Sequence, residues 1–372
     1  MKCNGTYWLQ VQTRHGEFNF PNQKFHSPEQ GSSAFLKATE DCQSAVTRGL
    51  TALAVETCMD AQSYTKSRQA LSEVTGESLL CRQTLCNWVK KTADRIDKLI
   101  TEQVAETAEI PMPPLAAKID LYDPKTLELQ IFEDGILVKA QKPTHEKQGE
   151  PRKDKPYQFC QSYFGLVPLP DGRYQFVMGS SDDTVSLSDC LRSFVCRHWS
   201  ASSEPLPLVA ITDGARDLRK DLHSAFGEIT VLLDWYHLRK KTCECASMLV
   251  STKEARTELK KKLLKLLYHG QVPEALQVLA DLPIRNAMMH NKLITYLTNH
   301  AHEIIDYERR SKAQKTIGSG RMEKGVDQVI GQRQKDRGMS WSKRGSYALG
   351  QLTAYRANGQ WGQLWTTSEM AT

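Results

Sequence analysis

The sequence predicts an α/β protein in which helices flank a mixed β-sheet, with a helical region before the sheet and a helical insertion within it. Short strand candidates separated by turn residues occupy positions 116–179. Two buried strands follow, at 208–212 and 229–233, and each leads into a helix. Helical periodicity dominates positions 33–110 and 238–315. Antiparallel strands followed by alternating strands and helices indicate a mixed sheet covered by helices.

Length and composition suit soluble globular domains. The 372 residues suffice for two or three packed units, and 40% of them are hydrophobic. No apolar run approaches the roughly 20 residues of a membrane span, and the start, MKCNGTYWLQ, lacks the apolar core of a secretion signal. We therefore expect a cytoplasmic protein with no membrane partner. The ten cysteines include no CxxC pair, so we expect reduced core residues there and no zinc site.

Changes in pattern divide the chain into five predicted parts. The proline-rich segment EIPMPP ends the first helical region, because proline cannot continue a helix. The predicted parts are an N-terminal hairpin at 1–30, a helical region at 31–110, the first part of the sheet core at 115–237, a helical insertion at 238–315 and the last part of the core at 316–372.

The second helix of the helical region has one apolar face. Cys81, Leu85, Trp88 and Val89 recur at helical spacing, and a short helix and a turn near Gly76 precede them. The pair suits a helix-turn-helix, although any αα-hairpin has the same pattern. Its second helix would enter the major groove of DNA, with Gln and Asn near base edges and Lys near phosphates. The residues expected to face DNA are Arg82, Gln83, Asn87, Lys90 and Lys91.

Two acidic residues of the core stand where a sheet can form a site. Asp213 directly follows a buried strand, and sites in open α/β sheets form at the carboxyl ends of strands. Asp134 belongs to an Asp-Gly pair between two strand-like segments, which is a strong hairpin signal, so a purely structural turn is the alternative. Two nearby acidic residues, Asp120 and Asp123, are the alternatives to Asp134 as the acidic site residue that precedes Asp213 in the sequence.

A second polar pair follows the next buried strand. Asp234 and His237 would lie at the same end of the sheet as Asp213 if the two strands run parallel. His237 could then orient a phosphate, and Asp234 could contact a metal ion. The alternative is a polar pair that satisfies the start of a helix.

The insertion is expected to form three helices. A capping box at 251–254 begins the first, which ends near Gly270. Pro273 begins the second, and the third spans roughly 286–310. Clustered lysines make part of the insertion basic, which suits phosphate contacts or an ordinary solvated face.

The segment GSGRMEKGVDQVIGQRQKDRGMSWSKRG, residues 318–345, combines one carboxylate with many cations. Glu323 stands three and seven residues before Val326 and Ile330, so it borders the buried stripe of a helix and would point toward the body of the protein. Residues 309–344 contain eleven Lys and Arg residues and three acidic ones, a balance that would hold a nucleic-acid backbone. The alternative is an exposed charged helix. The residues expected to contact DNA are Arg321, Lys324, Arg333, Lys335, Arg337 and Trp341, the last by base stacking unless it is a core residue.

Together these motifs resemble the DDE transposases of bacterial insertion sequences, specifically the Kra-type family with its RNase H-like catalytic core. In longer members of that family, the N-terminus resembles a zinc ribbon followed by a hairpin. This sequence starts at the hairpin, so we do not expect contacts between a zinc ribbon and DNA. The matching segments are TDGA at 212–215, LDWYHL at 233–238, GSGRMEKGVDQVIGQRQKDRGMSW at 318–341, NGQW at 358–361 and, more loosely, EDGILV at 133–138.

The resemblance implies that Asp134, Asp213 and Glu323 bind two Mg²⁺ or Mn²⁺ ions. Two such ions about 4 Å apart can activate an attacking oxygen and stabilise a leaving oxygen of a phosphodiester. It also implies double-stranded DNA as partner, both at the element ends and at the target, a homo-oligomer, and a place at the bacterial nucleoid. Two alternatives remain open: a hydrolytic nuclease of the same fold, and an inactive or domesticated DNA-binding protein.

Overall fold

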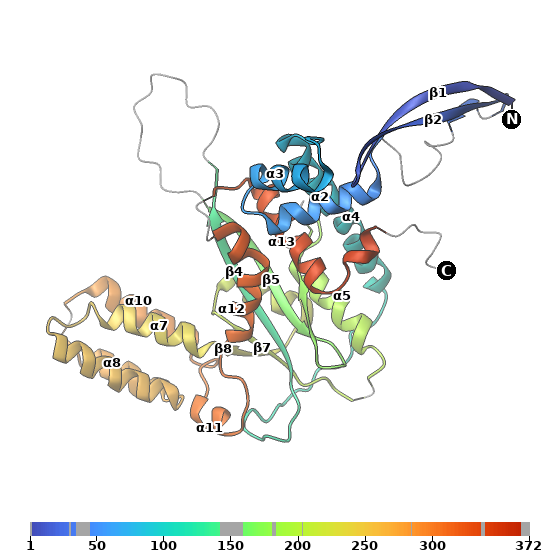
Figure 1. Cartoon of the computed structure of the whole chain (residues 1–372). Helices are drawn as coiled ribbons and strands as arrows, with labels where there is room; N and C mark the ends of the chain where they lie inside the picture. The colour runs from blue at the N-terminus through green and yellow to red at the C-terminus, as the bar shows by residue number, and fades with distance from the viewer. Residues whose placement is uncertain are drawn as a thin grey trace.

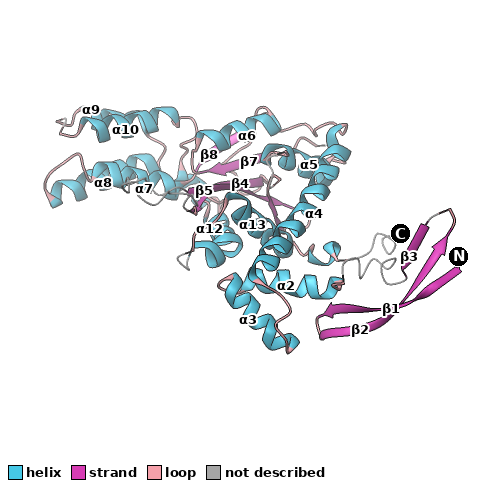
Figure 2. Ribbon diagram, turned by 90° about the horizontal axis from the view of Figure 1, so that it is seen from above, coloured by secondary structure: helices cyan, strands magenta, loops and turns pink. Residues whose placement is uncertain are grey.

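A five-stranded mixed sheet lies at the centre of the molecule, with helices on both of its faces (Figures 1 and 2). An N-terminal ribbon and a group of helices project from this body in different directions (Figure 2). The computed structural model describes residues 2–29, 31–34, 45–141, 159–180, 184–202, 204–283, 285–335 and 339–365.

The central sheet has the order β6-β5-β4-β7-β8. Its first three strands in the sequence pair antiparallel, whereas β7 and β8 continue the sheet parallel to β4. This arrangement confirms the predicted mixed sheet flanked by helices. The strands are β4 (Leu129–Lys139), β5 (Phe159–Pro168), β6 (Tyr174–Val177), β7 (Leu208–Thr212) and β8 (Thr230–Leu233).

Strand β4 corrects the predicted hairpin turn. It continues through the Asp134-Gly135 pair, with Asp134 opposite Phe164 and Gly135 opposite Tyr163 of β5. A Cβ atom at position 135 would lie 3.1 Å from Cε1 of Tyr163, so the glycine leaves room for the tyrosine ring of the neighbouring strand. An Asp-Gly pair therefore marks close approach here, and no turn.

Each face of the sheet is covered by its own helices. Helices α5 (Leu187–Trp199) and α6 (Arg216–Phe226) pack on one face, where Leu191, Phe194 and Leu222 join a buried apolar cluster. Helices α12 (Gly320–Val326) and α13 (Lys343–Ala357) pack on the other, as Figure 2 shows. A π-helical segment, η2 (Asp327–Lys335), continues α12, and a short 3₁₀ helix, η3 (Trp361–Leu364), follows α13.

The N-terminal part combines a β-ribbon with three helices. The predicted hairpin is present as β1 (Lys2–Thr13) and β2 (Gly16–Ser27), and β3 (Gly31–Ala34) adds a third strand. The expectation of helix from residue 33 was wrong at its start, because residue 33 belongs to β3 and the first described helix begins at Arg48. The helices are α2 (Arg48–Asp60), α3 (Tyr64–Thr75) and α4 (Arg82–Ala108).

The insertion between β8 and α12 forms helical hairpins that extend away from the sheet (Figure 1). The predicted third helix, 286–310, is in fact two helices separated by a turn that begins at His300. Within the described ranges, no helix combines the length and apolar character that crossing a membrane requires. The helices are α7 (Trp235–Ala246), α8 (Lys253–Tyr268), α9 (Val272–Ala280), α10 (Ala287–Asn299) and α11 (Tyr307–Lys312).

Candidate active site

Asp134 and Asp213 occupy neighbouring positions on two parallel strands. The register pairs Glu133 of β4 with Thr212 of β7, which places the next residue of each strand side by side. The pKa of Asp134 is raised to about 6, first by burial and then by the negative charge of Asp213, while His237 and Lys335 oppose the shift. The two carboxylates therefore repel each other at a half-buried position where β7 ends beside the middle of β4.

The turn after β7 fixes the carboxylate of Asp213. Its Oδ1 accepts a hydrogen bond of 2.7 Å from the backbone N–H of Ala215, and the backbone N–H of Gly214 donates to Oγ1 of Thr212 at 3.2 Å. Gly214 has a φ of +81°, a left-handed conformation that favours glycine. Thr212 is fully buried, so the TDGA segment presents Asp213 from a rigid base.

His237 belongs to the same site. Its Nδ1 lies 3.2 Å from Oδ2 of Asp234, and its pKa is raised first by that hydrogen bond and then by the charges of Asp234, Asp213 and Asp134 against the opposing effect of burial. The neighbouring carboxylates therefore favour the charged form of the His237 imidazole. The prediction that these residues share one end of the sheet agrees with this geometry.

Asp234 joins three segments of the chain. Fully buried, it caps α7 by accepting a hydrogen bond of 2.5 Å from the backbone N–H of Tyr236. Its Oδ2 also accepts hydrogen bonds from the backbone N–H of Ser319, at 2.9 Å, and from the Ser319 hydroxyl. These bonds occupy both carboxylate oxygens, so Asp234 serves the structural alternative: it satisfies the start of one helix and anchors the turn before α12.

Glu323 lies one turn into α12, and its side chain is exposed. The expectation that it points toward the body was wrong for this structure. The residues of α12 that face inward are Met322 and Gly325, and at Asp327 the hydrogen bonding changes to the wider π-helical pattern. The spacing that linked Glu323 to Ile330 on one helical stripe therefore does not apply.

Two carboxylates beside a histidine fit one divalent cation. Hard oxygen ligands suit Mg²⁺ or Mn²⁺, and Mg²⁺ commonly takes one or two protein carboxylates together with water. In the described part of the chain, no group of three or more His, Cys, Asp or Glu side chains is arranged to hold a metal ion. The structure thus brings Asp134 and Asp213 together and leaves Glu323 outside that pair, although α12 packs against β4 and β5.

Sequence reasoning missed the buried carboxylate next to Asp134, Glu133. Glu133 is 1% exposed, and neither of its side-chain oxygens has a hydrogen-bond partner. Its pKa is raised to about 9, first by burial and then by the charges of Asp221 and Asp213, so it carries a proton at neutral pH. The signal that could have found it is the strand period of two, which turns Glu133 to the opposite face of the sheet from Asp134.

The rival carboxylates form local turns before β4. Asp120 accepts hydrogen bonds from the backbone N–H groups of Tyr122 and Asp123, at 2.8 and 3.1 Å. Asp123 accepts from the backbone N–H of Lys125 at 3.0 Å and from the hydroxyl of Thr126 at 3.0 Å. The segment predicted as the first strand is therefore a loop, and both aspartates precede the strand whose middle carries Asp134.

Most residues predicted to face DNA from α4 lie on its exposed side. Side chains of Arg82, Gln83, Asn87 and Lys91 are exposed, and Lys90 is half-buried. The amide of Gln83 donates to Oδ1 of Asn87 at 3.0 Å, so the two form one polar patch on the first turns of α4. Gly76, with a φ of +74°, ends α3 ahead of this helix.

The basic residues near Glu323 divide into exposed and buried ones. Arg321 lies over the ring of Tyr174 at 4.4 Å, and Lys324 and Lys335 are exposed as well. Arg337 lies outside the described residues.

Arg333 and Trp341 were predicted to contact DNA, but both are buried. Arg333 is 5% exposed and donates to the backbone oxygens of Cys58 and Gln62, each at 3.0 Å, which fastens η2 to the end of α2. Trp341 is 4% exposed and donates from its indole N–H to the backbone oxygen of Gln334 at 3.2 Å. Trp341 is therefore the core residue that the alternative described.

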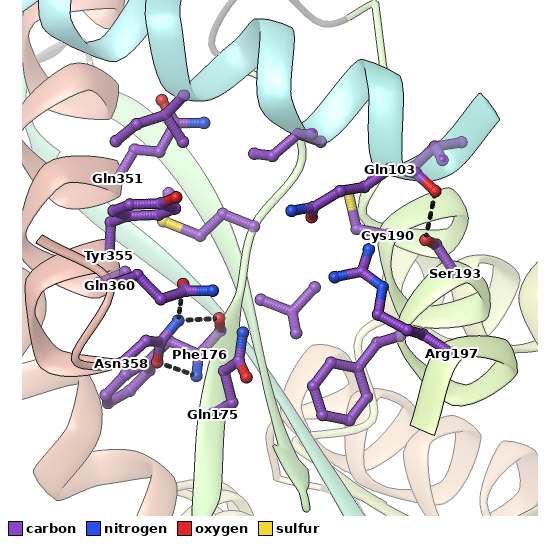
Figure 3. Close-up of a pocket in the computed structure, with 17 residues that line it drawn as sticks. Gln103, Gln175, Phe176, Cys190, Ser193, Arg197, Gln351, Tyr355, Asn358 and Gln360 are labelled. Atoms are coloured by element: carbon purple, nitrogen blue, oxygen red, sulfur yellow. Dashed lines mark hydrogen bonds between the residues drawn. The ribbon is translucent and has the colours of Figure 1, made fainter. Parts of the chain in front are cut away.

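A separate cavity of about 80 Å³ lies between α4, α5, β6 and α13. Figure 3 shows Gln351 and Tyr355 on one side of it and Ser193 and Arg197 on the other. No predicted site residue lines this cavity, so the candidate active site is the carboxylate pair formed by Asp134, midway along β4, and Asp213, directly after β7.

The chain matches no family model and no curated protein. Among solved structures, it is similar to the Drosophila P element transposase strand transfer complex, with 11% sequence identity and a TM-score of 0.33. That similarity covers 83% of this chain and 92% of the other. These comparisons assign the chain to no family.

Proposed function

We propose that this protein is a DDE-type DNA transposase of the Kra-type family, which cleaves the ends of an insertion sequence and joins them to target DNA. The observation that carries the proposal is the pair of repelling carboxylates, Asp134 and Asp213, with His237 beside them. The sheet supports it, because three antiparallel strands followed by two parallel ones suit an RNase H-like core.

The residues at the strand ends have separate roles in this proposal. Asp134 and Asp213 would bind divalent cations, and Glu323, by the sequence resemblance, would complete the ligands from α12. When bound, two such ions supply an activated attacking oxygen and stabilise the leaving oxygen. His237, oriented by its contact with Asp234, would donate to a phosphate oxygen.

DNA would be held by exposed cations and amides. The patch on the first turns of α4 would enter the major groove as the second helix of a helix-turn-helix. Arg321, Lys324 and Lys335 would contact phosphates beside Glu323. Because two element ends must be cut together, we propose that the protein acts as a homo-oligomer at the nucleoid.

A DNA-binding protein without catalytic activity is the second candidate. It is favoured by the exposed side chain of Glu323 and by the lack, among the described residues, of three His, Cys, Asp or Glu side chains arranged to hold a metal ion. A hydrolytic nuclease with the same residues would cut DNA but would not join the cut ends to a second molecule.

The deciding experiment uses the full chain with labelled duplexes that carry the two ends of its own element, a target plasmid, and Mg²⁺ or Mn²⁺. We expect end cleavage and joining by the wild type, and loss of both in Asp213→Asn and Glu323→Gln with DNA binding retained. Asp171→Asn, in the turn before β6, is the matched control and should remain active. Cleavage without joining would select the nuclease, binding without cleavage would select the inactive scaffold, and full activity of both variants would refute the site.

A further inference from the structure

The turn that carries Asp213 is packed against a histidine of the insertion. A Cβ atom on Gly214 would lie 2.7 Å from Cε1 of His300, which is closer than two carbon atoms can approach. His300 is 4% exposed and follows the last turn of α10. The imidazole therefore touches the backbone of the Asp213 turn directly, and no side chain other than hydrogen fits between them.

A buried carboxylate holds the imidazole in place. Nδ1 of His300 lies 2.5 Å from Oε2 of Glu303, which is 2% exposed. The ring of Tyr296 packs on His300, with 4.7 Å between ring centroids. The orientation of His300 is thus fixed by a short hydrogen bond on one side and an aromatic ring on another.

Glu303 also connects to helix α6, which follows the turn, and to strand β8, which pairs with β7. Its Oε1 accepts a hydrogen bond of 2.9 Å from Nη1 of Arg219 on α6, the helix that begins after the turn. Its backbone oxygen accepts a hydrogen bond of 3.0 Å from the backbone N–H of Leu233, at the end of β8. Burial favours a raised pKa for Glu303, but the hydrogen bond from His300 and the charges of His300 and Arg219 hold the pKa below its ordinary value.

We propose that His300 and Glu303 are positioning residues for the metal centre, acting through the Gly214 backbone to hold the Asp213 carboxylate beside Asp134. The insertion thereby contributes to the site although it supplies no ligand. This inference rests on the proposed metal-dependent function. Residues that orient ligands from behind commonly change metal affinity by about 10-fold to 100-fold when they are removed.

A merely structural cluster would behave differently, and the insertion contains a matched example. His290 is another buried histidine of α10, 6% exposed, and its Nε2 lies 2.8 Å from the backbone oxygen of Leu279. It lies within the insertion and does not contact the Asp213 turn. His290→Gln therefore reports the general cost of altering a buried histidine of the insertion.

The test uses the full chain and two measurements on each variant: Mn²⁺ affinity by calorimetry, and hydrogen exchange of the backbone amides of Gly214 and Ala215 without metal. In His300→Gln and Glu303→Gln, we expect Mn²⁺ affinity to fall about 10-fold and exchange at the two amides to rise about 10-fold. Far-UV circular dichroism checks that both variants fold. His290→Gln should leave Mn²⁺ affinity and the local exchange at wild-type values.

Outcomes separate this inference from the proposed function. If the wild type binds no Mn²⁺, the proposed metal-dependent function fails, and the exchange measurement still decides whether the two residues hold the turn. Wild-type exchange at Gly214 and Ala215 in both variants would overturn the inference, as would equal changes in His290→Gln. If only His300→Gln fails to fold, Glu303→Gln decides by the same two measurements.

Discussion

The carboxylate just before β4 and the two carboxylates midway along it have opposite surroundings. Just before the strand, Glu128 receives hydrogen bonds from Arg310 at 2.6 and 2.9 Å and from Lys315 at 2.8 Å. Burial would raise the pKa of Glu128, but those two cations hold it below its ordinary value. Midway along the strand, Glu133 and Asp134 have no such partner, and the pKa of each is raised.

This difference shows how to distinguish a structural carboxylate from a candidate metal ligand in the same part of the chain. At Glu128, Arg310 and Lys315 from the segment after α10 supply the compensating positive charge. This carboxylate therefore needs no bound metal ion. At Asp134, the nearest cationic groups, His237 and Lys335, only partly offset burial and the charge of Asp213. A cation bound from solution would supply the positive charge that compensates Asp134 and Asp213.

The largest effect on stability is expected at Glu128, whose charge is compensated by cations. Arg310 is fully buried and also donates to the backbone oxygens of Thr316 and Leu121. Arg310→Met would leave Glu128 with one cation, Lys315, and the amide of Gln130. Removing one partner of a buried ion pair costs about 3 kcal/mol or more of unfolding free energy. Urea denaturation at pH 7 measures this cost.

Arg309→Met is the control for that prediction. Arg309 is exposed and lies over the ring of Tyr122 at 4.5 Å, so its loss should cost well under about 1 kcal/mol. Equal losses in the two variants would mean that the Glu128 cluster stabilises the fold no more than a surface contact does.

The next effect concerns Glu133. Its pKa is raised from 4.5 to about 9, so the folded protein retains a proton that the unfolded chain releases. Stability from this proton is fully present below the unfolded pKa and is lost as pH rises toward the folded pKa, by up to about 1.4 kcal/mol per pH unit. Glu133→Gln should therefore become more stable relative to wild type by about 2 kcal/mol between pH 6 and pH 8.

Denaturation curves at those two pH values test this dependence, with Glu128→Gln as the opposite case. The pKa of Glu128 is lowered, so its ionised form stabilises the protein above the unfolded pKa, and its replacement should destabilise at both pH values. An identical pH dependence in wild type and Glu133→Gln would show that Glu133 is ionised or solvated.

A smaller effect is expected from metal binding at Asp134. Mn²⁺ at about five times its dissociation constant should stabilise the wild type by about 1 kcal/mol. Asp134→Asn and Asp213→Asn should abolish this gain, which thermal unfolding with and without Mn²⁺ measures. Because the pKa of Asp134 is about 6, binding at pH 6 should also release protons, detectable by calorimetry in buffers of different ionisation enthalpy.

Asp171→Asn again serves as the surface control, since Asp171 bonds to Arg173 within a turn. Metal stabilisation that survives in both active-site variants would place the cation elsewhere on the chain.

The smallest effect tests whether β4 must pass straight through the acidic pair. Gly135→Ala places a Cβ atom 3.1 Å from the ring of Tyr163, which should cost about 0.5 kcal/mol as the ring gives way. Tyr163→Ala in the same chain should remove that cost, so a double-mutant cycle measures the contact. Gly362→Ala has open space around its Cβ and should be neutral, and additive losses at 135 and 163 would contradict the contact.

The sequence predicted the parts of the fold that follow from local hydrophobic pattern. The strand at 208–212 was predicted at its observed bounds, and the N-terminal hairpin at 1–30 was also correct. Errors arose where a distant contact decides the local structure. The Asp-Gly pair is strand because Tyr163 pairs with it, and the helix predicted at 286–310 is broken where His300 turns toward Gly214.

The candidate site shows the same limit. Strand ends indicated Asp213, Asp234 and His237, because parallel strands bring their carboxyl ends together. Asp134 was chosen through the family resemblance, since its Asp-Gly pair by itself predicted a turn. The burial of Arg333 could not be inferred from a basic segment, since its acceptors belong to residues 58 and 62. The change to π-helix after α12, which takes Ile330 out of helical register with Glu323, likewise has no signal in apolar spacing.

The hydrogen bonds at Asp234 hold the two ends of the insertion together where it leaves and re-enters the body of the protein. The backbone N–H of Trp235 donates to the backbone oxygen of Ile317 at 3.1 Å, directly beside the contact between Asp234 and Ser319. Closing a loop costs little more when the loop is longer. The insertion between Trp235 and Ile317 can therefore differ in length among related chains without moving α12. The condition is that its last turn still places His300 and Glu303 against the Asp213 turn.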